Sequence, residues 1–152
     1  MQKQKFSVKV PASLVNELSL ALREAEAEGE RIALGVANAR ERSSAVWSDV
    51  SEGRIAVKRS AQRLSDLSKA ARGDAAIAAL MAPLEDFVHG AREELDALEA
   101  THEEESRTLR ALEAKLATNR ALCAALSEAL AACEVEGASS PVDETGGWSS
   151  VW

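Results

Sequence analysis

The chain has 152 residues and a net charge of -7, with 28% charged and only 3% aromatic residues. Its length suits one domain or one long supersecondary unit, and its many alanines favour an all-α fold over a compact α/β core. The acidic balance disfavours a role in which the whole chain binds nucleic acid or a membrane surface. Because the N-terminus lacks the apolar core of a signal peptide and no run of about 18 apolar residues could span a bilayer, we expect a cytoplasmic protein.

The first eleven residues predict a short β-strand that ends at Pro11. In the segment KFSVKVP, large apolar residues occupy every second position: Phe6, Val8 and Val10. The polar residues between them are Lys5, Ser7 and Lys9. A period of two is typical of a strand, so we separate an N-terminal extension, 1–11, from a helical domain, 12–135.

The helical domain carries two long heptad seams, which predict a coiled coil. From Val88 to Cys133, steps of three and four residues meet mostly apolar side chains, and we expect this seam also to join copies of the chain. Its leucines are Leu95, Leu98, Leu109, Leu112, Leu116, Leu126 and Leu130. Its polar exceptions are His102, Glu105 and Asn119. The same spacing from Leu18 to Ala71 gives a weaker seam, because it includes small residues: Gly29, Ser43, Gly53 and Ser60.

A turn near residues 73–82 is expected between the two seams. Gly73 can end one helix, Asp74 can cap the next, and Pro83 suits a first helical turn. Residues 1–72 carry a net charge of +4 and residues 73–152 one of -11, which together give the -7 of the chain. A turn in this region places the basic stretch 54–63 opposite the acidic stretch 84–105. Charge and periodicity therefore both predict a long antiparallel helical hairpin.

Two helices of about 50 to 60 residues that share one Ala-rich seam leave apolar surface unburied. Either the hairpin is broken into a shorter bundle, with the break at 41–54, or the remaining face packs on another copy or a partner. The stretch 41–54 combines paired serines with Asp49 and Gly53, and Trp47 within it is expected to be a local packing anchor.

No catalytic, cofactor-binding or metal-binding constellation is recognisable, so we expect no enzyme, no cofactor and no small-molecule substrate. The two histidines, His89 and His102, lie thirteen residues apart, and His102 is placed to form a polar pair with Glu105 on the seam. Cys123 and Cys133 are too far apart on one helix for a disulfide and are expected to be reduced apolar fillers.

The tail 136–152 is rich in Gly, Ser and acidic residues, a composition typical of a flexible segment. It carries three large apolar residues at its tip: Trp148, Val151 and Trp152. Tryptophan is enriched among the residues that dominate binding interfaces. The tip is therefore a candidate docking peptide for a protein partner, and the alternative is that it folds back onto its own helical body or a second copy.

The stretch FSVKVPASLVNELSLALREAEAEG, within residues 5–29, resembles the start of ribbon-helix-helix DNA-binding proteins. That resemblance implies a dimer in which paired strands enter the major groove, with Lys5, Ser7 and Lys9 toward the bases. The apolar residues between them would face the dimer core. The chain departs from the family after Gly29, where the sequence ERIALGVANAR continues without a cap for a second helix. A strand that packs on the helical body, or pairs in a dimer without DNA, is the alternative.

The sequence thus favours a non-enzymatic helical scaffold or adaptor that self-associates and docks a protein partner through its tail, without a membrane. The alternative from another class is a dimeric ribbon-helix-helix-type DNA-binding accessory protein. At the level of architecture, the chain also resembles the stalk proteins of flagellar and type III secretion ATPases and small helical components of phage assembly.

Overall fold

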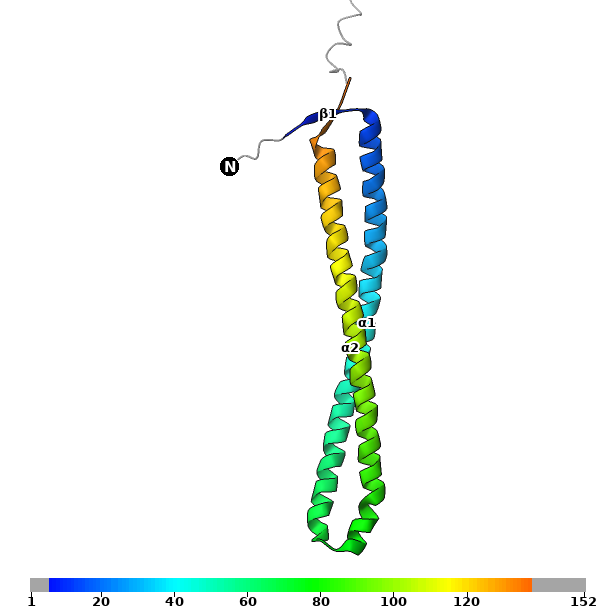
Figure 1. Ribbon diagram of the computed structural model, residues 1–152, viewed down its shortest axis with the longest axis vertical. Helices are drawn as coiled ribbons and strands as arrows, with labels where there is room; N and C mark the ends of the chain where they lie inside the picture. The colour runs from blue at the N-terminus through cyan, green and yellow to red at the C-terminus, as the bar shows by residue number, and fades with distance from the viewer. Residues whose placement is uncertain (1–5, 138–152) are drawn as a thin grey trace, which may run out of the picture. The chain divides into compact units, whose positions relative to one another are not determined.

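The computed structural model describes residues 6–137 and contains two helices and two short strands (Figure 1). In chain order these are β1 (Val8–Val10), α1 (Ala12–Ala71), α2 (Ala75–Ala132) and β2 (Cys133–Val135). The two long helices pack as an antiparallel hairpin, which confirms the predicted fold class.

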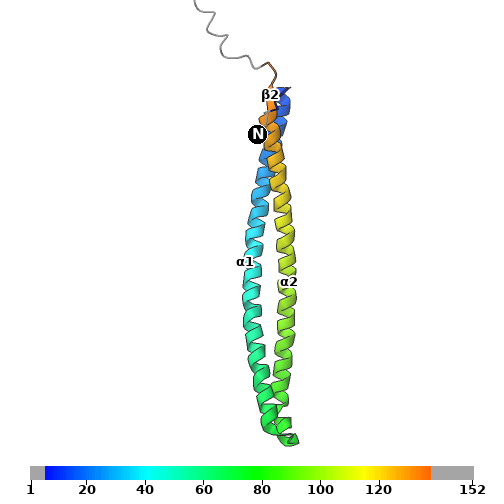
Figure 2. The ribbon, with the colours of Figure 1, turned by 90° about the vertical axis from the view of Figure 1, so that its left-hand side faces the viewer.

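The chain divides into two compact units, each of which contains part of both helices. We call residues 32–115 the turn unit, and residues 6–31 together with 116–137 the strand unit. In the turn unit, α1 and α2 run next to each other in opposite directions and are joined by the loop 72–74 (Figure 2).

The loop is formed by two residues with left-handed backbone followed by a helix cap. Arg72 and Gly73 have φ angles of 48° and 77°, and the Asp74 N–H donates to the Ala71 carbonyl over 3.0 Å. The Asp74 Oδ1 accepts the backbone N–H of Ala76 at 2.9 Å, which satisfies one free donor at the start of α2. Pro83 does not lie in the first turn, as its sequence position suggested, but inside α2.

The interior of the hairpin is a single layer of alanine and valine side chains with one methionine. The buried apolar residues within 6–137 are Ala25, Val36, Ala39, Val50, Ala71, Met81 and Val88. The largest fully buried side chain is Val50. Each of the seven belongs to the 3–4 spacing on its helix, because only this stripe of each helix faces the other.

Of the two alternatives for the long helices, the break at 41–54 does not occur, because α1 continues through this stretch without interruption. The Ser51 hydroxyl donates to the Trp47 carbonyl at 2.9 Å, so its polar group is satisfied inside the helix. Gly53 faces α2, and a Cβ atom added there would lie 3.2 Å from Leu95 Cδ1. Residues that weaken an isolated helix here permit close helix packing, so tertiary contact outweighs local propensity.

β1 and β2 form a two-stranded parallel sheet in the strand unit. Val8, Lys9 and Val10 pair with Cys133, Glu134 and Val135, and the Glu136 N–H donates to the Val10 carbonyl at 2.9 Å. The sequence predicted a strand at the N-terminus but no partner strand after α2.

Candidate interaction surface

The leucine seam of α2 faces α1 of the same chain. All seven seam leucines are half-buried: Leu95, Leu98, Leu109, Leu112, Leu116, Leu126 and Leu130. Two of them pack on glycines of α1, Leu95 on Gly53 and Leu112 on Gly35. This side of α2 is therefore used within the hairpin, and its role in joining copies of the chain stays a prediction.

A polar contact interrupts the seam in the strand unit, where Asn119 meets Gly29. The Asn119 Nδ2 donates to the Ala25 carbonyl at 2.9 Å, and its Oδ1 accepts the Cys123 thiol at 3.8 Å. A Cβ at position 29 would meet the Asn119 amide oxygen, so only glycine leaves room for this side chain. A polar residue on a seam fixes register, because any slip leaves its amide unpaired.

Three interhelical ion pairs border the seam in the turn unit. Arginines of α1 donate to glutamates of α2: Arg40 to Glu113 at 2.9 Å, Arg42 to Glu105 at 3.3 Å and Arg54 to Glu99 at 2.8 Å. All six side chains are at least partly exposed, so each pair stabilises the folded chain by no more than about 1 kcal/mol. In all three pairs α1 supplies the basic side chain and α2 the acidic one.

Trp47 lies over the middle of this ion-pair region. Its ring centroid is 5.0 Å from that of His102, and the Arg54 guanidinium lies 5.2 Å from the indole centroid. The expected pairing of His102 with Glu105 is therefore wrong, because His102 packs on Trp47 while Glu105 pairs with Arg42. Trp47 is still 45% exposed, so it packs at the border of the hairpin and not in its centre.

Large apolar side chains remain exposed outside the seam. Leu80 is 79% exposed, Leu34 is 64% exposed and Phe87 is 63% exposed. All three belong to the turn unit. Together these side chains offer apolar surface that a second chain could cover.

The N-terminal residues differ from the ribbon-helix-helix arrangement in two respects. β1 pairs in parallel with β2 of its own chain, and α1 continues far beyond Gly29. Ser7 and Lys9 are exposed, but so are the apolar residues Phe6 and Val8, at 81% and 45%. Lys5 lies outside the described residues. The resemblance therefore ends with the strand and the beginning of the helix.

The candidate docking residues Trp148, Val151 and Trp152 also lie outside the described residues. Docking of the tail on a partner and its fold-back onto the helices therefore both stay predictions.

Within residues 6–137, no group of three or more His, Cys, Asp or Glu side chains could hold a metal ion. Both cysteines are free, and the Cys133 thiol donates to the Ala129 carbonyl at 3.1 Å. Over the same residues, neither helix is long and apolar enough to cross a membrane.

Comparison of the chain with protein-family models, with curated proteins and with solved structures gave no match. Its function has therefore to be argued from the surface of the hairpin itself.

Proposed function

We propose that this chain is a non-enzymatic helical interaction protein, a scaffold or adaptor that self-associates and docks a protein partner through its tail. The observation that carries the proposal is the exposure of Leu80, Leu34 and Phe87 on a hairpin whose internal seam is already filled by its own two helices. Apolar side chains of this size gain free energy when a second chain removes them from water.

The tail supplies the second part of the proposal. Trp148 and Trp152 are four residues apart, so one helical turn would bring both rings to the same side of a docking peptide. Two such rings in a partner's pocket would provide most of the binding free energy, because a few aromatic anchors dominate typical interfaces. The ribbon-helix-helix alternative has less support, since β1 is engaged by β2 of its own chain.

The docking part is tested by affinity purification with three full-length forms of the protein. We expect the wild-type chain to retain a partner and a Trp148→Ala/Trp152→Ala variant to lose it. A Ser149→Ala/Ser150→Ala variant is the matched control and should retain the partner. All three forms should melt at the same temperature. If the tryptophan variant instead unfolds several degrees earlier, the rings stabilise the chain's own body and docking through the tail is rejected.

The self-association part is tested by light scattering coupled to gel filtration. A mass of 16.2 kDa, that of a single chain, at every concentration up to about 100 μM would contradict it.

A further inference from the structure

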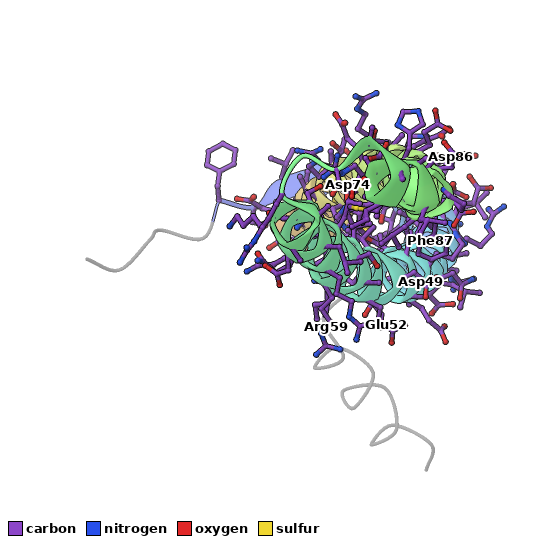
Figure 3. The ribbon with its side chains drawn as sticks, turned by 90° about the horizontal axis from the view of Figure 1, so that it is seen from below. Asp49, Glu52, Arg59, Asp74, Asp86 and Phe87 are labelled. Atoms are coloured by element: carbon purple, nitrogen blue, oxygen red, sulfur yellow. The ribbon has the colours of Figure 1, made fainter. Side chains whose placement is uncertain are left out.

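An unpaired charged stripe runs along one flank of α1 in the turn unit. Its members follow the 3–4 spacing of the seam, each directly preceding a seam residue: Asp49, Glu52, Ala56, Arg59 and Arg63. All five are exposed, and none of the four charged side chains forms an ion pair with another described residue. Seen from the turn, Asp49, Glu52 and Arg59 lie along the same side of the hairpin (Figure 3).

When two copies of this stripe lie antiparallel, the acidic residues of each copy face the basic residues of the other. Two acidic residues precede Ala56 by seven and four residues, and two basic residues follow it by three and seven. Consider a two-fold axis that lies between two copies, perpendicular to α1 and level with Ala56. It would place Asp49 of one copy opposite Arg63 of the other, and Glu52 opposite Arg59. The symmetry repeats both contacts, so four ion pairs would surround a central pair of alanines small enough for close approach.

The opposite flank of the seam offers no comparable set. Arg40 and Arg54, which directly follow seam residues, are already paired with Glu113 and Glu99 of the same chain. The third basic residue of α1 on that flank in the turn unit, Lys58, has no acidic counterpart there, so this flank lacks the self-complementary charge order of the Asp49–Arg63 stripe.

An apolar contact on α2 fits the same axis. Phe87 is 63% exposed and lies on the side of the hairpin that carries Asp49 (Figure 3). Further along α2 there is a shallow groove of about 370 Å³, lined by Glu94, Ala97, Leu98 and Thr101. Three of these four lining residues directly precede a seam residue, as Phe87 does, so the groove and the phenyl ring share one flank.

The hairpin register relates this groove to the two-fold axis. Gly53 packs on Leu95, so Ala56, three residues further along α1, lies level with residue 92, three residues back along α2. Phe87 precedes this level by five residues, and Ala97 follows it by five. The axis that pairs the charges of α1 therefore also brings Phe87 of each copy to the groove around Ala97 of the other.

We propose that two copies of this chain associate through this flank as an antiparallel two-fold dimer, with α1 against α1 and α2 against α2. The inference rests on the self-association in the proposed function and identifies its surface. Phe87 and Ala56 form the apolar centre of the interface, and the charged stripe sets the direction and register of pairing. A parallel pairing is disfavoured because it would bring like charges together.

Charge reversal provides the test, carried out on the full-length chain by light scattering across a concentration series. An Asp49→Arg/Glu52→Arg variant has an all-basic stripe, and an Arg59→Glu/Arg63→Glu variant has an all-acidic one. Each should associate with itself at least about tenfold more weakly than wild type, because attraction becomes repulsion at four places. An equimolar mixture of the two should regain a mass of about twice 16.2 kDa, since the stripes of the two variants are again complementary.

A matched control carries the same change in net charge on the other flank. Glu85→Arg/Asp96→Arg replaces two exposed acidic residues and should leave the dimer intact. Asp96 follows the seam residue Leu95, and Glu85 follows Leu84, which continues the same 3–4 spacing four residues before Val88. Phe87→Ala should weaken association, whereas Leu122→Ala, at a 51% exposed leucine outside the turn unit, should not. Circular dichroism should show the same helix content for every variant.

The outcomes separate the two proposals. If wild type dimerises and both stripe variants dimerise equally well, this flank is not the interface, although self-association stands. If the variants separate but their mixture stays monomeric, the antiparallel register is overturned. A wild-type chain that is monomeric throughout contradicts both this interface and the self-association from which it follows.

Discussion

Replacing Gly29 by alanine should destabilise the protein, although alanine is the better helix former. A Cβ at this position would collide with the Asn119 amide oxygen, which lies at the far end of a side chain that can rotate away. Rotation, however, breaks the hydrogen bond from Asn119 Nδ2 to the Ala25 carbonyl, which spans 2.9 Å in a partly buried setting. The substitution therefore exchanges a gain in helix propensity for the loss of a seam contact.

The size of the effect follows from these two contributions. Alanine in place of glycine in a helix stabilises by about 1 kcal/mol. The broken hydrogen bond and the partly buried amide that it leaves unpaired together cost about 2–3 kcal/mol. The net loss is about 1–2 kcal/mol, which lowers the melting temperature by roughly 2–8 °C for a chain of this size.

Gly90 provides the control, because a Cβ added there meets nothing within 4 Å. Gly90→Ala should stabilise by about 0.5–1 kcal/mol, so the two substitutions should differ in sign. Urea unfolding followed by circular dichroism at constant protein concentration measures both. An Asn119→Ala substitution removes the obstacle, so Gly29→Ala should stabilise in that background. If Gly29→Ala stabilises wild type as much as Gly90→Ala does, the role given to the Asn119 contact is refuted.

Two further predictions concern the ends of α2. Asp74→Ala removes the side chain that caps the helix and should cost about 1 kcal/mol in urea unfolding, whereas Asp74→Ser should cost far less. In a chain lacking Cys123, Val8→Cys should form a disulfide with Cys133 on mild oxidation, because these residues are paired across the parallel sheet. Lys9→Cys, one residue out of register, should crosslink much more slowly; equal rates on non-reducing gels would show that the register is wrong.

The hairpin was predictable because its signal is repeated many times along the chain. From Val88 to Leu130, every residue reached by the 3–4 count is buried or half-buried, including the polar exceptions His102, Glu105 and Asn119. From Leu18 to Ala71 on α1, the residues reached by the same count are also buried or half-buried, except Leu67, which is 48% exposed. A stripe sustained over many heptads tolerates single polar or small members, since the neighbouring contacts maintain the register.

Local signals were misleading where a contact distant in sequence decides the structure. Ser43 and Gly53 suggested a helix break, but both lie on the seam, where a small side chain lets α2 approach. β2 is three residues long and directly follows α2, so it has no alternation long enough to distinguish it from the end of a helix. It becomes a strand through its pairing with β1, from which more than a hundred residues separate it.

The proposed dimer surface depends both on the charge pattern of the sequence and on contacts between residues that are distant in sequence. The charge order from Asp49 to Arg63 is visible in the sequence, but any helix contains several stripes with 3–4 spacing, and only the seam shows which one borders the partner helix. Phe87 and Ala97 acquire a relation to Ala56 only when the Gly53–Leu95 contact sets the level of one helix against the other. A register slip of one heptad would remove that relation while leaving every residue of the stripe in place. The charge stripe alone therefore predicts self-pairing of α1, and its agreement with the apolar contact on α2 depends on the folded hairpin.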